Sequence, residues 1–147
     1  MVRIANGQGF WGDSVDAPKN LIRYGNIDYL TLDYLAEVTM SIMQKQKLRN
    51  PEAGYARDFV QLIDEMLPDI LSNDIKIISN AGGVNSSSCS DEIVKLAAKM
   101  KGRSAPVGII EGDDILDRMD ELYRSGVSFE NMDTGESFES IKDKVYS

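Results

Sequence analysis

The sequence contains no histidine and a single cysteine, Cys89, among its 147 residues. The absence of histidine excludes Ser-His-Asp and Cys-His nucleophilic systems, imidazole bases and every metal site that uses imidazole. A single cysteine allows neither an intrachain disulfide nor a CxxC site. We therefore expect a cytoplasmic protein, kept in a reducing compartment, in which Cys89 is a small buried residue.

Long apolar runs and a basic surface are also missing. No segment approaches the roughly 18–20 apolar residues of a membrane helix, and the N-terminus lacks the apolar stretch of a secretory signal. The net charge is −8, and residues 111–147 hold 11 of the 24 acidic residues beside four bases. We therefore expect neither nucleic acid nor a membrane as partner. The acidic C-terminal third is either a solvated surface or a contact for a partner subunit.

The apolar pattern alternates between short extended runs and helical stripes. Strands are expected at residues 2–5, 27–32, 75–79 and 106–110, and helices at 17–24, 35–47, 55–73, 88–101 and from 113 or 114 to 123. This order, with strands that are apolar on both faces, is typical of a parallel sheet covered by crossover helices. The predicted fold is an open, doubly wound, Rossmann-like α/β sheet of about four mostly parallel strands with helices on both faces. Residues 1–126 form this domain, and residues 127–147 form an acidic C-terminal extension.

Each predicted strand ends in polar or glycine-rich sequence. Because parallel strands present their carboxyl ends at one edge, where such sheets bind ligands, these loops are expected to surround one site. The candidate ligand-binding residues are Gly7, Gly9, Trp11, Gly12, Asp13, Gly82, Gly83 and Asn85. The candidate catalytic residues are Asp33, Glu37, Asn80 and Glu111, and the candidate metal ligands are Asp113 and Asp114.

Each of these assignments has a plain alternative. Gly7-x-Gly9-x-x-Gly12 spells the dinucleotide fingerprint, but two bulky residues between the glycines and a late helix start favour a tight glycine-rich loop. The Gly82-Gly83 turn either cradles an anion at a helix N-terminus or is an ordinary strand-to-helix turn. The carboxylates either do acid–base chemistry or hold Mg²⁺, or they cap helices and complement helix dipoles.

These loops resemble the N-terminal signature of the acyclic terpene utilisation (AtuA-like) family. The similarity lies in five blocks in the same order, at residues 7–18, 28–42, 51–59, 79–85 and 111–114, and includes the strings GQGFWGDS, SNAGGVN and EGDD. The resemblance implies a bacterial-type cytoplasmic protein, linked to the catabolism of citronellol- and geraniol-like acids that are handled as CoA thioesters. Family members are longer, so the resemblance covers their N-terminal portion only and implies a split subunit, a truncated gene product or an excised piece.

We therefore expect an enzyme subunit or fragment of the acyclic terpene utilisation type. It would act on a small carboxylate or acyl-CoA thioester by acid–base chemistry of the hydratase or lyase kind, with Asp33, Glu37 or Glu111 as general acid or base. Asn80 and the loop amides near residues 82 and 83 would stabilise an oxyanion. Two alternatives stay open: a non-catalytic half-domain that needs a partner chain, and a dinucleotide-binding domain. The expected cofactors are a CoA thioester substrate or Mg²⁺, with NAD less favoured, and the expected partner is a second copy or a separate chain that supplies the missing C-terminal part.

Overall fold

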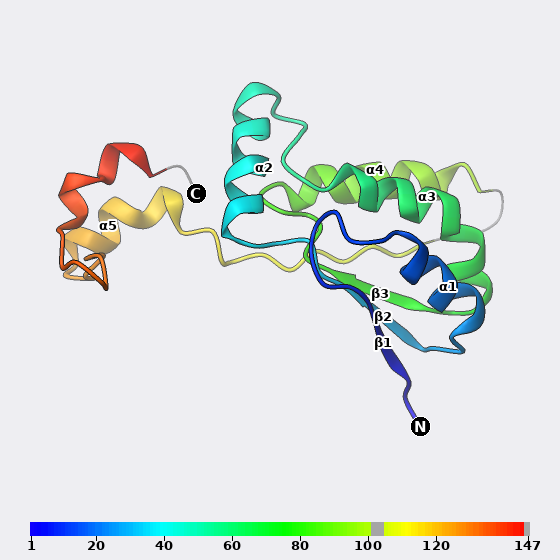
Figure 1. The fold of residues 1–147 in the computed structure, drawn as a ribbon. Helices are drawn as coiled ribbons and strands as arrows, with labels where there is room; N and C mark the ends of the chain where they lie inside the picture. Colours follow the sequence, from blue (N-terminus) through cyan, green and yellow to red (C-terminus); the bar gives the residue numbers. More distant parts are fainter. Residues whose placement is uncertain (101–104, 146–147) are drawn as a thin grey trace. The chain divides into compact units, whose positions relative to one another are not determined.

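Three short parallel strands form the sheet in this computed structural model, which describes residues 1–100 and 105–145 (Figure 1). The strands are β1 (Ile4–Gln8), β2 (Tyr29–Leu32) and β3 (Lys76–Ser79), in the spatial order β1-β2-β3. Ala5, Leu30 and Ile77 pair across the sheet, and so do their successors Asn6, Thr31 and Ile78. Because side chains alternate along a strand, these two rows point to opposite faces.

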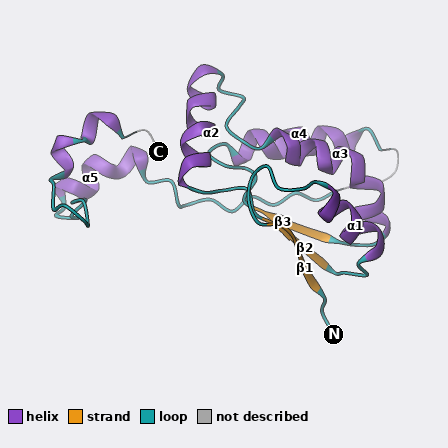
Figure 2. Cartoon of the chain, in the orientation of Figure 1, coloured by secondary structure: helices purple, strands orange, loops and turns teal. Residues whose placement is uncertain are grey.

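Four helices belong to the same unit as the sheet, the unit Met1–Ile109. They are α1 (Asp16–Tyr24), α2 (Glu37–Arg49), α3 (Arg57–Ser72) and α4 (Ser86–Ala98). All four were expected from the sequence; the prediction for α4 ended at residue 101, which lies outside the described residues. Figure 2 shows α1 and α3, which connect neighbouring strands, on the same side of the sheet. Right-handed crossovers that advance in one direction place their helices on one face.

The core lies between that face of the sheet and the helices. Leu30, in the central strand, and Met66, in α3, are completely buried. The inward stripe of α3 has helical spacing and consists of Phe59, Leu62, Ile63, Met66, Leu67 and Ile70. Burial of this broad stripe in one core with Leu30 and Leu32 of β2 holds α3 over the covered face of the sheet.

The opposite face of the sheet is exposed. Ile4 and Ile78 on this face are 69% and 56% exposed, although parallel sheets are usually covered on both faces. The predicted doubly wound, Rossmann-like arrangement is therefore not confirmed. Apolar runs in the strands indicated cover on both sides, but a run of apolar residues does not reveal whether the chain itself supplies that cover.

The prediction of a fourth strand at residues 106–110 is wrong. Residues 105–115 have no regular secondary structure, and Ile110 is 97% exposed. Pro106 lacks the backbone N–H that a ladder needs. The apolar residues here have β-propensity but no neighbouring strand with which to pair, so propensity alone does not produce a strand.

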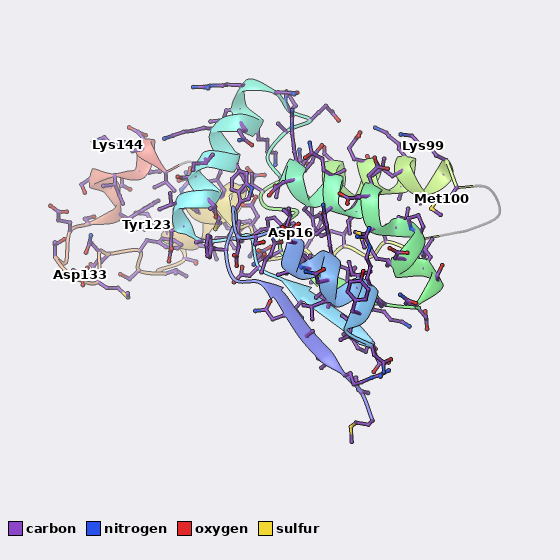
Figure 3. The ribbon with its side chains drawn as sticks, turned by 45° about the vertical axis from the view of Figure 1, so that its right-hand side comes forward. Asp16, Lys99, Met100, Tyr123, Asp133 and Lys144 are labelled. Carbon is purple, nitrogen blue, oxygen red and sulfur yellow. The ribbon has the colours of Figure 1, made fainter. Side chains whose placement is uncertain are left out.

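The second unit, Ile110–Ser147, has a small aromatic core of its own. It contains α5 (Met119–Arg124) and three 3-10 turns, Leu116–Arg118, Phe138–Ser140 and Lys142–Lys144. Phe138 is buried, and its ring centroid lies 5.4 Å from that of Tyr123 and 5.2 Å from that of Phe129. The Lys142 ammonium lies 2.7 Å from the Asp120 carboxylate. Tyr123 and Lys144 mark two helical segments of this unit in Figure 3.

Candidate functional site

A hollow of about 480 Å³ lies on the exposed face of the sheet, at the carboxyl ends of the strands. Its lining comes from all three strands and from the turns that follow β2 and β3. The strand residues are Asn6, Thr31, Leu32, Ile78 and Ser79, and the turn residues are Asp33 and Asn80. The edge predicted from the sequence thus carries a pocket, and two of the four predicted catalytic residues line it.

Asp33 and Asn80 are joined by a hydrogen bond. The Asn80 Nδ2 donates to Asp33 Oδ1 at 2.8 Å, and the Asn80 Oδ1 accepts from the backbone N–H of Tyr34 at 2.7 Å. Asp33 Oδ1 also accepts from the backbone N–H of Leu35 at 3.2 Å. The turn after β3 therefore fixes the turn after β2 and holds the Asp33 carboxylate in place.

These hydrogen bonds favour the ionised form of Asp33. Donation by the Asn80 amide, and then by the backbone N–H of Leu35, lowers the pKa of the Asp33 carboxyl below its usual value. Asp33 is therefore ionised across the physiological pH range. The Asp33 carboxylate also interacts with the backbone N–H of Tyr34. Asn80 Nδ2 uses one of its two hydrogens in the bond to Asp33, and the amide nitrogen of Asn6 makes no hydrogen bond within the described residues. The pocket offers a ligand one charged acceptor and two neutral donors.

The loop after β1 is closed by its own aspartate. Asp13 Oδ2 accepts from the backbone N–H of Gly9 at 3.1 Å, and Asp13 Oδ1 accepts from that of Ser14 at 2.7 Å. These bonds, first the one from Gly9, lower the pKa of Asp13. In a dinucleotide fingerprint the loop amides approach a pyrophosphate, but here a carboxylate lies against one of them. The first helical residue, Asp16 (labelled in Figure 3), adds another negative charge to the N-terminus of α1.

Gly7 and Trp11 have packing roles. A Cβ on Gly7 would lie 2.9 Å from Leu32 Cδ2 and 3.1 Å from Pro18 Cβ, so this glycine lets α1 approach the sheet closely. The Trp11 Nε1 donates to Asp58 Oδ1 at 2.9 Å and attaches the loop to the first turn of α3. Gly9 and Gly12, by contrast, have open space around them.

The Gly82-Gly83 turn and Asn85 hold α4 in place. Gly83 has a φ of 56°, and a Cβ there would overlap the Met43 sulfur and lie 2.7 Å from the Gly54 carbonyl oxygen. Asn85 donates to the carbonyl oxygens of Pro51 and Ala53 at 2.8 and 2.7 Å, and its Oδ1 accepts from Ser88 N at 3.4 Å. An ordinary strand-to-helix turn with Asn85 as N-cap explains these contacts. Binding of an anion at the N-terminus of α4 stays a prediction.

The remaining predicted carboxylates come from other elements of the chain. Glu37 is exposed in the first turn of α2, where it complements the helix dipole. Glu111, Asp113 and Asp114 belong to the second unit, in which Asp114 Oδ1 accepts from the backbone N–H of Leu116 at 3.0 Å, just before a 3-10 turn. Within residues 1–100 and 105–145 no three acidic or cysteine side chains gather into a metal site. Among these residues, no third acidic or cysteine side chain joins Asp113 and Asp114 in such a group, and their metal role stays a prediction.

Five pocket residues were missed by the sequence analysis: Asn6, Thr31, Leu32, Ile78 and Ser79. Among them, Asn6, Thr31 and Ile78 share one row on the exposed face. The alternation of side chains along β1 and β2 would have placed the two polar ones together, because residues in register on parallel strands face the same side.

Cys89 is buried, as the sequence predicted. Its exposed fraction is 3%, and burial raises the pKa of the thiol to about 11. A thiol in that state carries almost no thiolate at neutral pH and is a poor nucleophile. Cys89 therefore contributes to packing.

Comparison with known families gives one result. A family model described as "Acyclic terpene utilisation family protein AtuA" matches residues 2–147. No curated protein and no solved structure matches the chain significantly. Among the described helices, none has the length and apolar character needed to span a membrane.

Proposed function

The chain belongs to the acyclic terpene utilisation family, and from this premise we propose that its pocket binds a small carboxylate or acyl thioester. The observation that carries the proposal is the Asp33–Asn80 pair at the carboxyl edge of the sheet, inside a pocket of about 480 Å³. This edge is where open parallel sheets bind ligands.

The charge of the pocket determines how such a ligand lies. Asp33 is ionised, so a free carboxylate of the ligand would be repelled from it. A thioester carbonyl oxygen can accept from the amides of Asn80 and Asn6, and a neighbouring hydroxyl can donate to Asp33. A hydroxyacyl thioester therefore complements the pocket better than a simple acid.

The reaction supported by this arrangement is proton transfer beside a carbonyl. Asp33 would accept a proton from the carbon next to the thioester carbonyl; the electron pair of the broken C–H bond would form a C=C bond to the carbonyl carbon, and the carbonyl π pair would move onto the oxygen. Donation from Asn80 would stabilise the resulting oxyanion. The lowered pKa of Asp33 weakens it as a base, so stabilisation of the oxyanion is the larger contribution.

Thermal-shift titration of the full chain tests the proposal. The probes are 3-hydroxybutyryl-CoA, butyryl-CoA, free CoA and Mg²⁺, and ligands that bind the native state raise the unfolding midpoint. We expect 3-hydroxybutyryl-CoA to give the largest shift and Asp33→Asn to abolish its difference from butyryl-CoA. Asp69→Asn is the matched control, because Asp69 pairs with Arg23 and does not line the pocket. Equal shifts from free CoA and the thioesters, or no loss in Asp33→Asn, would overturn the proposal.

A second candidate function is an interaction half-domain, favoured by the exposed sheet face. Ile4 and Ile78 lie on this face, and a chain packed over it would also close the open side of the pocket. Among the predicted partners we commit to a second copy of the chain. Sedimentation velocity should show a dimer that Ile78→Lys dissociates; a monomer at high concentration would contradict this candidate.

A further inference from the structure

The unit Ile110–Ser147 contains a hollow of its own, of about 190 Å³, which we call the acidic hollow. Four apolar and three charged side chains line it: Leu116, Met119, Phe138 and Val145, and Asp117, Asp120 and Lys142. Phe138 is only 3% exposed and belongs to the aromatic core of this unit, so the hollow borders that core. Its volume is below the roughly 300–1,000 Å³ of small-molecule sites, and it therefore fits one side chain rather than a whole cofactor.

The charged groups of the acidic hollow are not balanced. The Lys142 ammonium lies 2.7 Å from the Asp120 carboxylate and is engaged by it. The Asp117 carboxylate, by contrast, makes neither an ion pair nor a hydrogen bond within residues 1–100 and 105–145. The hollow therefore presents an apolar wall together with one carboxylate that lacks a cation.

The same imbalance extends over the whole unit. Residues 111–147 hold 11 acidic residues beside four bases, and three of those bases already pair with acids of this unit: Arg118, Arg124 and Lys142. A second copy of the chain carries the same net charge of −8 and is repelled by this surface, whereas a positively charged segment is attracted to it. Charge complementarity therefore favours a basic partner over a second copy.

One kind of side chain matches both the apolar wall and the carboxylate. Lysine and arginine bury their methylene stems along apolar surfaces while their charged heads stay at the edge. In the acidic hollow such a stem would contact Phe138 and Met119, and its head would reach Asp117. A single free amine would leave the other carboxylates of the unit without cations, so a peptide segment with several bases is the better complement.

We propose that the acidic hollow is a docking site for a basic segment of another protein, which inserts one lysine or arginine side chain into it. This inference goes beyond the proposed function, because the hollow and the Asp33 pocket belong to different units of the chain. Failure of one therefore does not imply failure of the other. Asp33→Asn should leave docking unchanged.

NMR titration of the uniformly ¹⁵N-labelled full chain tests the proposal. The probe is acetylated and amidated tetralysine. Its counterpart is the tetrapeptide of 2,4-diaminobutyric acid, which carries the same charges on stems that are two methylenes shorter. The variant is Asp117→Asn. Asp133→Asn is the matched control, because it removes the same charge from the same unit, and Asp133 (labelled in Figure 3) does not line the hollow.

We expect tetralysine to shift the backbone N–H signals of Leu116, Met119 and Val145 saturably. It should bind about tenfold more tightly than the shorter peptide, because two more methylenes are buried. Asp117→Asn should weaken binding about two- to fivefold, whereas Asp133→Asn should bind like the wild type.

Three results would overturn the proposal. Equal affinities for the two peptides would show that charge alone attracts them and that no stem enters the hollow. Equal weakening by Asp117→Asn and Asp133→Asn would show that the site is not the hollow. Shifts of the same three signals that depend on protein concentration in the absence of peptide would assign the hollow to a second copy.

Discussion

The Asn80 side chain makes hydrogen bonds to Asp33 and to the backbone of the next residue. Its Nδ2 donates to the Asp33 carboxylate at 2.8 Å, and its Oδ1 accepts from the backbone N–H of Tyr34 at 2.7 Å. The two turns it joins are 46–47 residues apart in the sequence. One side chain therefore fixes the position and the charge of the carboxylate that the proposed chemistry uses.

Replacement of Asn80 should affect both stability and the titration of Asp33. Asn80→Ala removes hydrogen bonds to a carboxylate and to a backbone N–H, and we expect it to lower the free energy of unfolding by about 1–2 kcal/mol. The pKa of Asp33 should rise, because its principal donor is lost. Urea denaturation measures the first effect and NMR titration of the carboxyl measures the second. An unchanged pKa of Asp33 would show that the bond is absent in solution.

The stability of the protein should decrease in acid because of a small set of aspartates. Hydrogen bonds lower the pKa of Asp13, Asp28 and Asp33 in the folded state, while unfolded aspartates titrate near about 3.9. Their contribution is fully present above that value and is lost as the pH falls through the lower folded pKa values. Thermal unfolding between pH 6 and about pH 2 should therefore show a flatter dependence in Asp33→Asn than in the wild type. An equally steep curve would contradict this.

Gly83 should not tolerate a side chain. Gly83→Ala forces a Cβ onto a residue with a φ of 56° and against the Met43 sulfur, and we expect a loss of about 2–4 kcal/mol in unfolding free energy. Gly108→Ala is the control, because no atom lies within 4 Å of its Cβ position. Chemical denaturation compares the two. Similar stabilities for both variants would mean that the turn before α4 is not built as described.

Ile78 should be important for binding but not for folding. It lines the pocket and is 56% exposed, so Ile78→Lys should change stability by less than about 0.5 kcal/mol while placing a long side chain in the pocket. Ile4→Lys, on the same face but outside the pocket, should leave ligand binding intact. Calorimetric titration with 3-hydroxybutyryl-CoA distinguishes them. Equal affinities for both variants would place the ligand elsewhere.

Much of the fold follows from sequence periodicity. The stripe of α3 and the short apolar run of β3 are predicted within a few residues, because each pattern reflects the burial of one face. The prediction of a fourth strand is wrong, because a strand needs a neighbouring strand with which to pair, and the local sequence does not show whether one is present. The exposure of Ile78 was missed for a related reason: the sequence of a strand does not say what covers it.

The candidate site could be predicted only in part. The position of Asp33 and Asn80 follows from the rule that parallel strands end at one edge. The role of Asp13 does not follow from that rule. Its carboxylate could either bind a ligand or accept a hydrogen bond from the nearby N–H of Gly9, and in the structure it accepts the bond. Short polar side chains often bond to their own backbone, and sequence alone does not show which option is taken.

The most direct test of the proposed site is NMR of the uniformly ¹⁵N-labelled chain during titration with 3-hydroxybutyryl-CoA. Our account predicts that the side-chain amides of Asn6 and Asn80 and the backbone N–H of Asp33 shift together and saturate at one affinity. Saturable shifts that spare these three groups, or that are reproduced in full by free CoA, would contradict it.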